Sequence, residues 1–505
     1  MGTPSINLNV IANYFGQGYT LAIAIIFTPL YLQYLGAESY GLVGFFMMMQ
    51  NWLNLLDMGL SATFIRQVSF ARGKVSRFKK FINLLRSFEI IFFAIAISVV
   101  LVIYFKSDWL AYKWIKAIQL SPEIISYCIS IMGIVVGLRF FSTLYRGGIV
   151  GFEDQIWLNK ALVVINSLKY IGAFLIIIYI SNDIKLFFEY QLIIAFLEVG
   201  ILGRRFYFDL PLSVTSKNWF TLDWSFFREV LPFSISIAYT SALQMIVSQF
   251  DKLLLSGLLA LNIFGYFSII AIISGGVITL AVPIFIAFQP RLTMLVARNS
   301  IDEMISLYTE MTQIVICIVF SSAMIIVAYP QEILYLLTGD NRTYIWGGEV
   351  LKWYVLGSSV TVMGSCQYYL QNAFGKLRLY VIGLTLLLMV QAPLIYFVTT
   401  KYGAIGAGQL WFAFSLIWFL GFTLVVHNKF IPRFHFKWLF KDILPMLLFI
   451  SMLAYITKNS IHIDASDSRM TILLKLSIIS ACFLMVTSTS IAKVRNKLLK
   501  KVIRR

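Results

Sequence analysis

The chain has 505 residues, of which 59% are hydrophobic and 13% are charged, and its mean hydropathy is +0.83. Soluble globular proteins carry about 45–50% apolar and about 25% charged residues, so this composition excludes most soluble classes: cytosolic enzymes, secreted disulfide scaffolds and nucleic-acid binders. Intrinsic disorder is excluded because it requires low hydrophobicity. We therefore predict an all-α polytopic membrane protein, in which the net charge of +18 is first a sign of membrane topology.

Fourteen apolar segments are candidate membrane spans, since a helix needs about 20 mostly apolar residues to cross the hydrocarbon. In chain order they are 8–34, 40–61, 87–105, 124–144, 158–180, 186–202, 231–255, 263–289, 307–328, 349–370, 379–399, 403–426, 443–457 and 470–491. The sixth and thirteenth are short. The connecting loops are also short, which leaves no room for a soluble catalytic domain.

Basic residues collect in alternate connecting segments, above all in 66–86 and in the C-terminal tail 493–505. Lys and Arg mark cytoplasmic loops, so we expect both termini to lie in the cytoplasm. The sequence has no phosphate-binding loop of the Walker A type, which argues against a nucleotide-hydrolysing domain. The cysteines lie within apolar runs and the histidines lack metal-ligand spacing, so we expect no metal site. We also expect no cofactor and no enzyme activity, because transport across the membrane requires no covalent chemistry.

Two short segments resemble one another and lie at equivalent places between spans. Segment 33–43 separates the first two spans, and segment 257–267 separates the seventh and eighth. Their alignment pairs Leu35 with Leu259, Tyr40 with Phe264, and Gly41 with Gly265. An internal repeat of this kind is common in transporters. We therefore expect an N-terminal lobe at 1–205, a cytoplasmic linker at 206–230, a C-terminal lobe at 231–428, and two further helices with a basic tail at 429–505.

Polar side chains recur at helical spacing within four of the spans. The stripes are Asn9, Asn13, Gln17 and Thr20; Gln50, Asn54, Asp57 and Ser61; Ser241, Gln244, Ser248 and Asp251; and Thr361, Ser365, Tyr368 and Asn372. Polar stripes inside a membrane face either a cavity or another helix to which they hydrogen-bond. The sequence alone leaves both interpretations open.

Basic residues within spans are a sharper signal, because a charge at the bilayer centre costs about 2.5–3.5 kcal/mol on insertion scales. Arg139, Ser142 and Arg146 are spaced to share one face of a helix, and Lys169 lies in the middle of the next span. These cations either snorkel to the interface or bind phosphate. Arg offers phosphate oxygens a planar fork, and Lys offers a point charge.

Two carboxylates also lie within predicted spans, Asp57 and Asp251. One interpretation is that they form structural ion pairs or hydrogen bonds at helix ends. The other is that they bind a coupling proton or Na⁺, because ionisable residues inside a membrane are often part of an ion pathway.

Four short motifs give a resemblance to a known family. They are Leu35-Gly36-Ala37-Glu38-Ser39-Tyr40-Gly41-Leu42; Leu56-Asp57-Met58-Gly59-Leu60 followed by Arg66; Tyr145-Arg146-Gly147-Gly148 with Gly151; and Asp251-Lys252-Leu253 with Gly265-Tyr266. In these motifs and in the order of its spans over about 6–491, the chain resembles the polysaccharide-transporter branch of the multidrug/oligosaccharidyl-lipid/polysaccharide exporter superfamily. Within that branch it is most similar to the flippases of O-antigen and capsule repeat units.

This resemblance implies two six-helix lobes around a cavity that opens alternately to each side of the bacterial inner membrane. The cargo would be an undecaprenyl-diphosphate-linked oligosaccharide for lipopolysaccharide O-antigen or a related surface polysaccharide. Arg139, Arg146 and Lys169 would then hold the phosphates, and Asp57 and Asp251 would bind the coupling ion. The sugars would contact Asn13, Gln17, Gln50, Asn54 and Gln244. The partners would be membrane lipids, the polysaccharide polymerase and assembly proteins. Nucleic acid would not be a partner.

Two other functions within the superfamily stay open. A cation-coupled multidrug exporter would depend on Asp57 and Asp251 rather than on the arginines. A lipid II flippase ranks third, because such proteins are expected to carry arginines in the first helix and no basic residue precedes Arg66 here. A membrane-embedded polymerase or glycosyltransferase is disfavoured, since the outer loops 106–123 and 329–348 are small and lack paired carboxylates.

Overall fold

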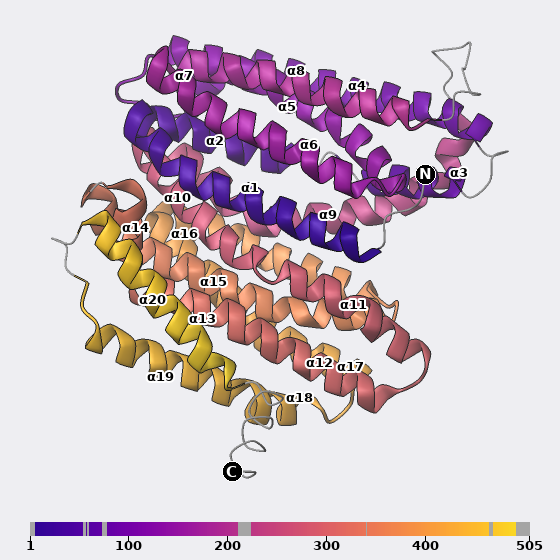
Figure 1. The fold of residues 1–505 in the computed structure, drawn as a ribbon, viewed down its shortest axis with the longest axis vertical. Helices are drawn as coiled ribbons and strands as arrows, with labels where there is room; N and C mark the ends of the chain where they lie inside the picture. The colour runs from indigo at the N-terminus through magenta and orange to yellow at the C-terminus, as the bar shows by residue number, and fades with distance from the viewer. Residues whose placement is uncertain are drawn as a thin grey trace. The chain divides into compact units, whose positions relative to one another are not determined.

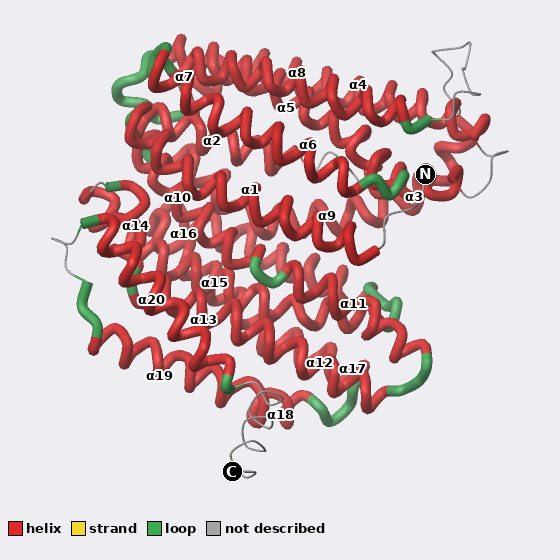
Figure 2. The backbone as a smooth tube through the Cα atoms, in the orientation of Figure 1, coloured by secondary structure: helices red, strands yellow, loops and turns green. Residues whose placement is uncertain are grey.

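The computed structural model describes residues 6–53, 57, 60–72, 78–210, 224–339, 341–463 and 468–490. This part of the chain consists of helices joined by short turns and contains no strand (Figures 1 and 2). It divides into two compact units, Met1–Gly265 and Tyr266–Arg505. The all-α polytopic fold that the sequence predicts is confirmed. Residues 211–223 of the predicted linker lie outside the described part, and the predicted lobe boundaries stay a prediction.

The first unit is built around α5. Its helices are α1 (Ile6–Leu35), α2 (Ala37–Leu53), α3 (Leu60–Arg72), α4 (Phe78–Trp109), α5 (Pro122–Gly151), α6 (Gln155–Ser167), α7 (Ala173–Tyr179), α8 (Ile184–Phe208) and α9 (Trp224–Leu258). Two π-helical turns continue them, η2 (Leu110–Trp114) after α4 and η3 (Leu168–Gly172) between α6 and α7. Helix α5 packs against α3, α4 and α8. It approaches α4 closely at Gly137, where a Cβ atom would lie 2.7 Å from Val100.

The second unit begins within α10 and continues to the C-terminus. Its helices and π-helical turns are α10 (Leu261–Thr279), α11 (Val282–Ala297), α12 (Ile301–Val315), η4 (Ile316–Phe320), α13 (Ser321–Ala328), α14 (Pro330–Thr338), α15 (Asn341–Ala373), α16 (Arg378–Ile417), η5 (Trp418–Phe422), α17 (Thr423–Phe430), α18 (His435–Lys437), η6 (Trp438–Ile443), α19 (Leu444–Ser460) and α20 (Arg469–Ser488). Helix α13 packs against α15, α19 and α20. The last two predicted spans therefore belong to the core of this unit.

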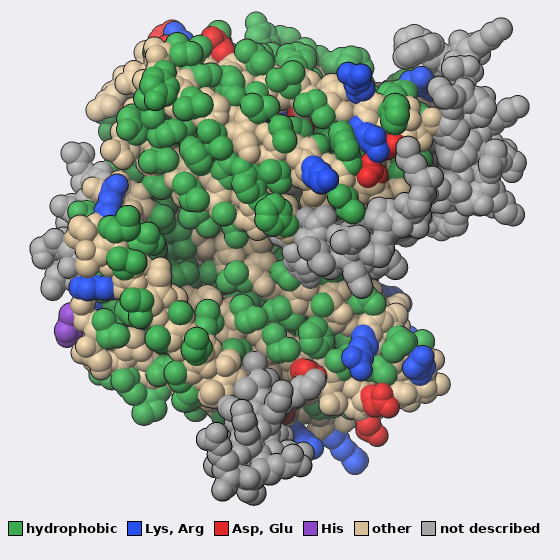
Figure 3. Space-filling view, in the orientation of Figure 1, with side chains coloured by type: hydrophobic (Ala, Val, Ile, Leu, Met, Phe, Trp, Pro, Cys, Tyr) green, Lys and Arg blue, Asp and Glu red, His purple; other side chains and the backbone are tan. Residues whose placement is uncertain are grey.

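Ten helical segments of the described part are long and apolar enough to cross a membrane. Large hydrophobic side chains on their surfaces are exposed, among them Val102 (63%) and Phe105 (75%) on α4. On the face drawn in Figure 3, hydrophobic side chains cover the middles of the helices, and the visible charged side chains lie toward helix ends. A water-soluble protein rarely exposes apolar patches of this extent. The chain is a multi-pass membrane protein.

Three helix breaks refine the predicted spans. Gly403 has φ +62° and ψ −147° within α16, which separates the two spans predicted at 379–399 and 403–426. The span predicted at 40–61 is not one helix, because α2 ends at Leu53 and Asp57 lies in a turn before α3. The span predicted at 263–289 is divided between α10 and α11. Pro283 stands in the first turn of α11, where its missing N–H group is not needed.

One loop connects two turns that the internal repeat predicted to be equivalent. The carboxylate of Glu38, in the first turn of α2, accepts hydrogen bonds from three consecutive backbone amides: Ile118 (2.5 Å), Gln119 (2.8 Å) and Leu120 (3.4 Å). In the same loop, Lys116 forms a parallel bridge with Ala260, and the amide of Leu261 donates to the Lys116 carbonyl at 2.8 Å. The loop therefore ties the α1–α2 turn to the α9–α10 turn.

We expect Glu38→Ala to lower the stability of the protein by about 1–2 kcal/mol, because three amides lose a charged acceptor. The loss of stability is limited because Ile118 and Gln119 are exposed, so water can accept the hydrogen bonds of their amides in place of the carboxylate. Thermal unfolding of the purified protein in detergent measures the effect. Glu349→Ala, at a side chain that is 56% exposed, is the matched control. Equal melting temperatures for the two variants would contradict this role of Glu38.

Candidate functional site

The predicted cations of α5 face a polar stripe on α8. Arg139, Ser142 and Arg146 share one face of α5, and Gln191 and Glu198 lie seven residues apart on one face of α8. Helices α5 and α8 pack along one another within the first unit. Two polar faces on otherwise apolar helices are thereby brought together.

Arg139 lies between these helices with part of its hydrogen-bonding capacity unused. Its side chain is 11% exposed, and its Nη2 donates to Gln191 Oε1 at 2.9 Å. Its Nε lies 3.9 Å from Glu198 Oε2, and its guanidinium carbon lies 5.4 Å from the centre of the Phe46 ring. Among the described residues, Nε and Nη1 have no hydrogen-bond partner. Arg139 can therefore bind a further acceptor.

Glu198 holds the second arginine. Glu198 is 6% exposed, and its Oε1 lies 3.1 Å from Arg146 Nη2. The hydroxyl of Ser142 donates to the same oxygen at 3.5 Å. The Arg146 side chain is 41% exposed, so it lies at the rim of the cluster rather than in its centre. One carboxylate thus serves both arginines of α5.

Lys169 is positioned by the π-helical turn η3. Three consecutive carbonyl groups of this turn accept hydrogen bonds from side chains: Leu168 from Tyr190 Oη (2.8 Å), Lys169 from Gln191 Nε2 (3.0 Å) and Tyr170 from Tyr31 Oη (2.7 Å). The Gln191 amide therefore joins η3 to Arg139, since its oxygen accepts from that guanidinium. π-helical turns are frequent at functional sites, and these bonds fix the direction in which Lys169 leaves the helix.

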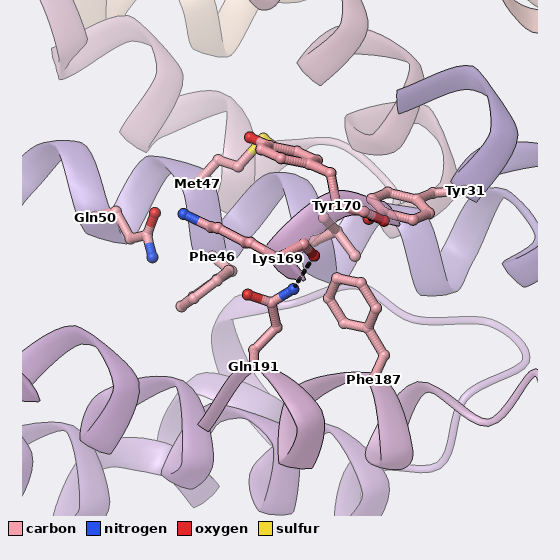
Figure 4. A pocket seen from close by; sticks show the side chains of 9 residues that line it. Tyr31, Phe46, Met47, Gln50, Lys169, Tyr170, Phe187 and Gln191 are labelled. Atoms are coloured by element: carbon pink, nitrogen blue, oxygen red, sulfur yellow. Dashed lines mark hydrogen bonds between the residues drawn. The ribbon is translucent and has the colours of Figure 1, made fainter. Parts of the chain in front are cut away.

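The Lys169 side chain enters a pocket of about 310 Å³, counting the part that is open to the outside. The pocket is lined by Tyr31, Val43, Phe46, Met47, Gln50, Lys169, Tyr170, Phe187 and Gln191. In Figure 4 the amino group points from η3 toward Gln50 of α2, above Phe46 and Gln191. The structure gives Nζ no hydrogen bond to a described residue, and the buried Nε2 of Gln50 also lacks such a partner. Two N–H donor groups therefore face the same pocket.

This arrangement suits an anion rich in acceptor oxygens. Among the described contacts, Glu198 is the only carboxylate within ion-pair distance of Arg139 and Arg146, and none lies within that distance of Lys169. A buried charge is costly unless it is paired and hydrogen-bonded, and phosphate oxygens would satisfy both needs at once. A metal ion would not pair with these cations. The described residues also contain no group of three metal-ligating side chains.

The predicted sugar contacts are only partly described. Gln50 lines the pocket, whereas Gln17 on α1 and Gln244 on α9 are exposed and are not part of its lining. The side chain of Asn13 and the whole of Asn54 lie outside the described residues.

The two predicted ion-coupling carboxylates occupy different surroundings. Asp57 Oδ1 accepts hydrogen bonds from the Ser61 amide (3.2 Å) and hydroxyl (2.5 Å), so it caps the start of α3. Asp251 is 4% exposed, and its Oδ1 lies 3.7 Å from Lys252 Nζ. Both contacts fit the structural interpretation of these residues, and ion coupling stays a prediction.

Sequence reasoning missed Glu198 and Gln191 as members of this site. A signal was present, because they are two polar residues at a seven-residue spacing in an apolar span. The aromatic wall, formed by Tyr31, Phe46 and Tyr170, carried no such signal. Aromatic residues are frequent in every span, and only packing selects the few that meet Lys169.

No protein-family model matches the chain, and no curated protein matches it. Solved structures do match. The lipid II flippase MurJ in an inward-closed conformation has a TM-score of 0.68 at 15% identity, covering 99% of this chain and 100% of that one. An inward-facing multidrug resistance MATE family transporter of the MOP superfamily has a TM-score of 0.63 at 15% identity, covering 81% and 94%. A MOP superfamily transporter from Pyrococcus furiosus has a TM-score of 0.55 at 15% identity, covering 83% and 96%.

The chain has the fold of these transporters. At such low identity the likeness extends to the fold and not to the cargo. The match to the lipid II flippase covers nearly the whole of this chain, whereas the other two leave part of it uncovered. This is the fold that the resemblance of the sequence motifs implied.

Proposed function

We propose that this protein is a flippase that moves a polyprenyl-diphosphate-linked oligosaccharide across the bacterial inner membrane. The observation that carries the proposal is the cationic cluster of Arg139, Arg146 and Lys169, in which several N–H donors lack a hydrogen-bond partner among the described residues, within a transporter fold. A diphosphate loses its hydration when it enters a membrane protein, and it needs such donors to replace it. The cargo would serve O-antigen or a related surface polysaccharide.

In this proposal different residues of the chain bind different parts of the cargo. Arg139, Arg146 and Lys169 hold the diphosphate, while Gln50 and the other polar residues predicted from the sequence contact the sugars. The polyprenyl tail stays in the lipid, and the lobes open alternately to the two sides of the membrane. Both termini lie in the cytoplasm, as the distribution of basic residues indicates. No covalent chemistry is involved.

The same cluster argues against export of cationic drugs. A pocket that already contains Lys169 and adjoins Arg139 repels a positively charged substrate, because like charges in a low-dielectric site interact strongly. The cation-coupled multidrug exporter therefore explains these residues less well than a flippase of an anionic lipid does.

Lipid II is the second candidate cargo. It is favoured by the match to the lipid II flippase, which covers both chains almost completely. It is also a polyprenyl-diphosphate-linked sugar, so the cationic cluster suits it equally. The absence of basic residues before Arg66 is the sequence feature that places it second.

The lipid intermediates of a strain depleted of this protein distinguish these functions. With the biosynthetic genes intact, we expect mass spectrometry to find one complete polyprenyl-diphosphate-linked repeat unit accumulating while the surface polymer disappears. Expression of the intact chain should reverse both changes. Accumulation of lipid II instead would favour the second candidate. Normal surface polymer without any accumulated intermediate would contradict both.

A further inference from the structure

We propose that Glu198 is an internal counter-ion that the cargo's diphosphate displaces, and that its return to the arginines drives release. This inference rests on the proposed function, because it concerns the same cationic site. It assigns a role to a residue that the sequence motifs did not single out.

The contacts of Glu198 suit a ligand that can be exchanged. Its carboxylate reaches both arginines of α5, but only Arg146 lies within hydrogen-bond distance, at 3.1 Å. The contact with Arg139 is 3.9 Å, and the stronger bond of Arg139 goes to the neutral amide of Gln191 at 2.9 Å. Glu198 therefore neutralises Arg139 without satisfying its donors.

The unused donors of the site give a diphosphate the advantage over Glu198. Arg139 Nε and Nη1 and Arg146 Nε lack hydrogen-bond partners among the described residues. A single carboxylate on α8 does not fill these positions, whereas a diphosphate brings more negative charge and more acceptor oxygens. Binding of the cargo would then free Glu198 from the arginines while it stays buried beside them.

A carboxylate fixed beside the phosphate site makes the bound state less stable than the cations alone would. Tight binding without a competitor would slow the release of the cargo on the far side of the membrane, because translocation must end in dissociation. The cations raise the affinity of the site for the diphosphate, and the carboxylate of Glu198 lowers it again by competing for the same donors. The charged groups in contact with Glu198 are Arg139 and Arg146 of α5.

The test is Glu198→Gln in the full-length protein, purified and reconstituted in lipid nanodiscs and liposomes. Farnesyl diphosphate is the binding probe, and movement of a labelled polyprenyl-diphosphate sugar across liposomes measures transport. We expect the variant to bind the probe about tenfold more tightly, since a charged competitor is removed. Dissociation should slow by a similar factor, and transport should fall. Opposite changes in binding and transport are the signature of the proposal.

Matched variants keep the test decisive. Glu89→Gln removes another carboxylate of the first unit, one that pairs with Arg86 at 2.6 Å, and should bind the probe like the unmodified protein. Ser142→Ala removes a hydroxyl that donates to the Arg139 carbonyl at 2.8 Å and lies 3.5 Å from Glu198 Oε1. Because this weakens the support of Glu198 only slightly, the variant should tighten binding by at most about twofold, even if Glu198→Gln folds poorly. If both Glu198→Gln and Ser142→Ala bind the probe more weakly, Glu198 has only a structural role and the inference fails. If the unmodified protein does not bind farnesyl diphosphate saturably, the proposed function itself fails.

Discussion

Replacing Lys169 by methionine should stop transport while making the protein more stable. Transport should fall at least about tenfold, because the diphosphate loses a charged donor worth about 1.5–3 kcal/mol. Stability should rise by about 1–2 kcal/mol, because exchanging a partly buried charge that has no ion-pair partner for an apolar side chain of similar volume is often stabilising. The Lys169 ammonium has no carboxylate within ion-pair distance among the described residues, so its removal leaves no counter-ion unpaired.

Transport in liposomes and thermal unfolding in detergent together test this prediction. Lys160→Met is the matched control, because Lys160 is exposed on α6, the helix that leads into η3. It should change neither quantity. A Lys169→Met protein that transports normally would remove Lys169 from the phosphate site. A protein that loses both transport and stability would indicate that Lys169 serves the fold instead.

Trp438→Ala should be the most destabilising of the substitutions considered, at about 3–5 kcal/mol. Trp438 is 1% exposed in the second unit, and its indole N–H donates to Thr312 Oγ1 at 3.1 Å. It also packs edge-on against His427, with ring centres 4.8 Å apart, and against Phe419 at 6.0 Å. Truncation would leave a cavity where η6 meets α12, and so loosen the last two membrane helices.

Two companion variants separate the parts of this effect. Trp438→Phe keeps most of the volume but loses the hydrogen bond to Thr312, and should cost about 1 kcal/mol plus a small packing loss. Phe436→Ala removes an aromatic side chain two residues away that is 62% exposed, and should have little effect. Melting temperatures of the three variants, measured in detergent, rank their stabilities. A Trp438→Ala protein as stable as Phe436→Ala would show that this cluster does not hold the unit together.

Much of the fold was predictable from the sequence because span formation is a local property. A run of apolar residues long enough to cross the hydrocarbon forms a helix wherever it lies, since unsatisfied backbone groups are too costly in lipid. Even the break at Gly403 coincides with the first residue of the span predicted at 403–426. The end of α2 at Leu53 was missed, because 54–61 continues the helical polar spacing and gives no sign that Asp57 caps the next helix.

The sequence by itself predicted that Arg139 and Lys169 lie within spans and that Arg146, just beyond the end of its span, shares a helix face with Arg139. Only the tertiary structure decided that α8 lies opposite that face, with Glu198 as the shared counter-ion and Gln191 joining Arg139 to η3. The physical reason is that periodicity depends on neighbours three or four residues apart, whereas pairing depends on which helices pack together. That choice is made by contacts between residues about 50 positions apart, and nothing in the local sequence of α5 encodes it.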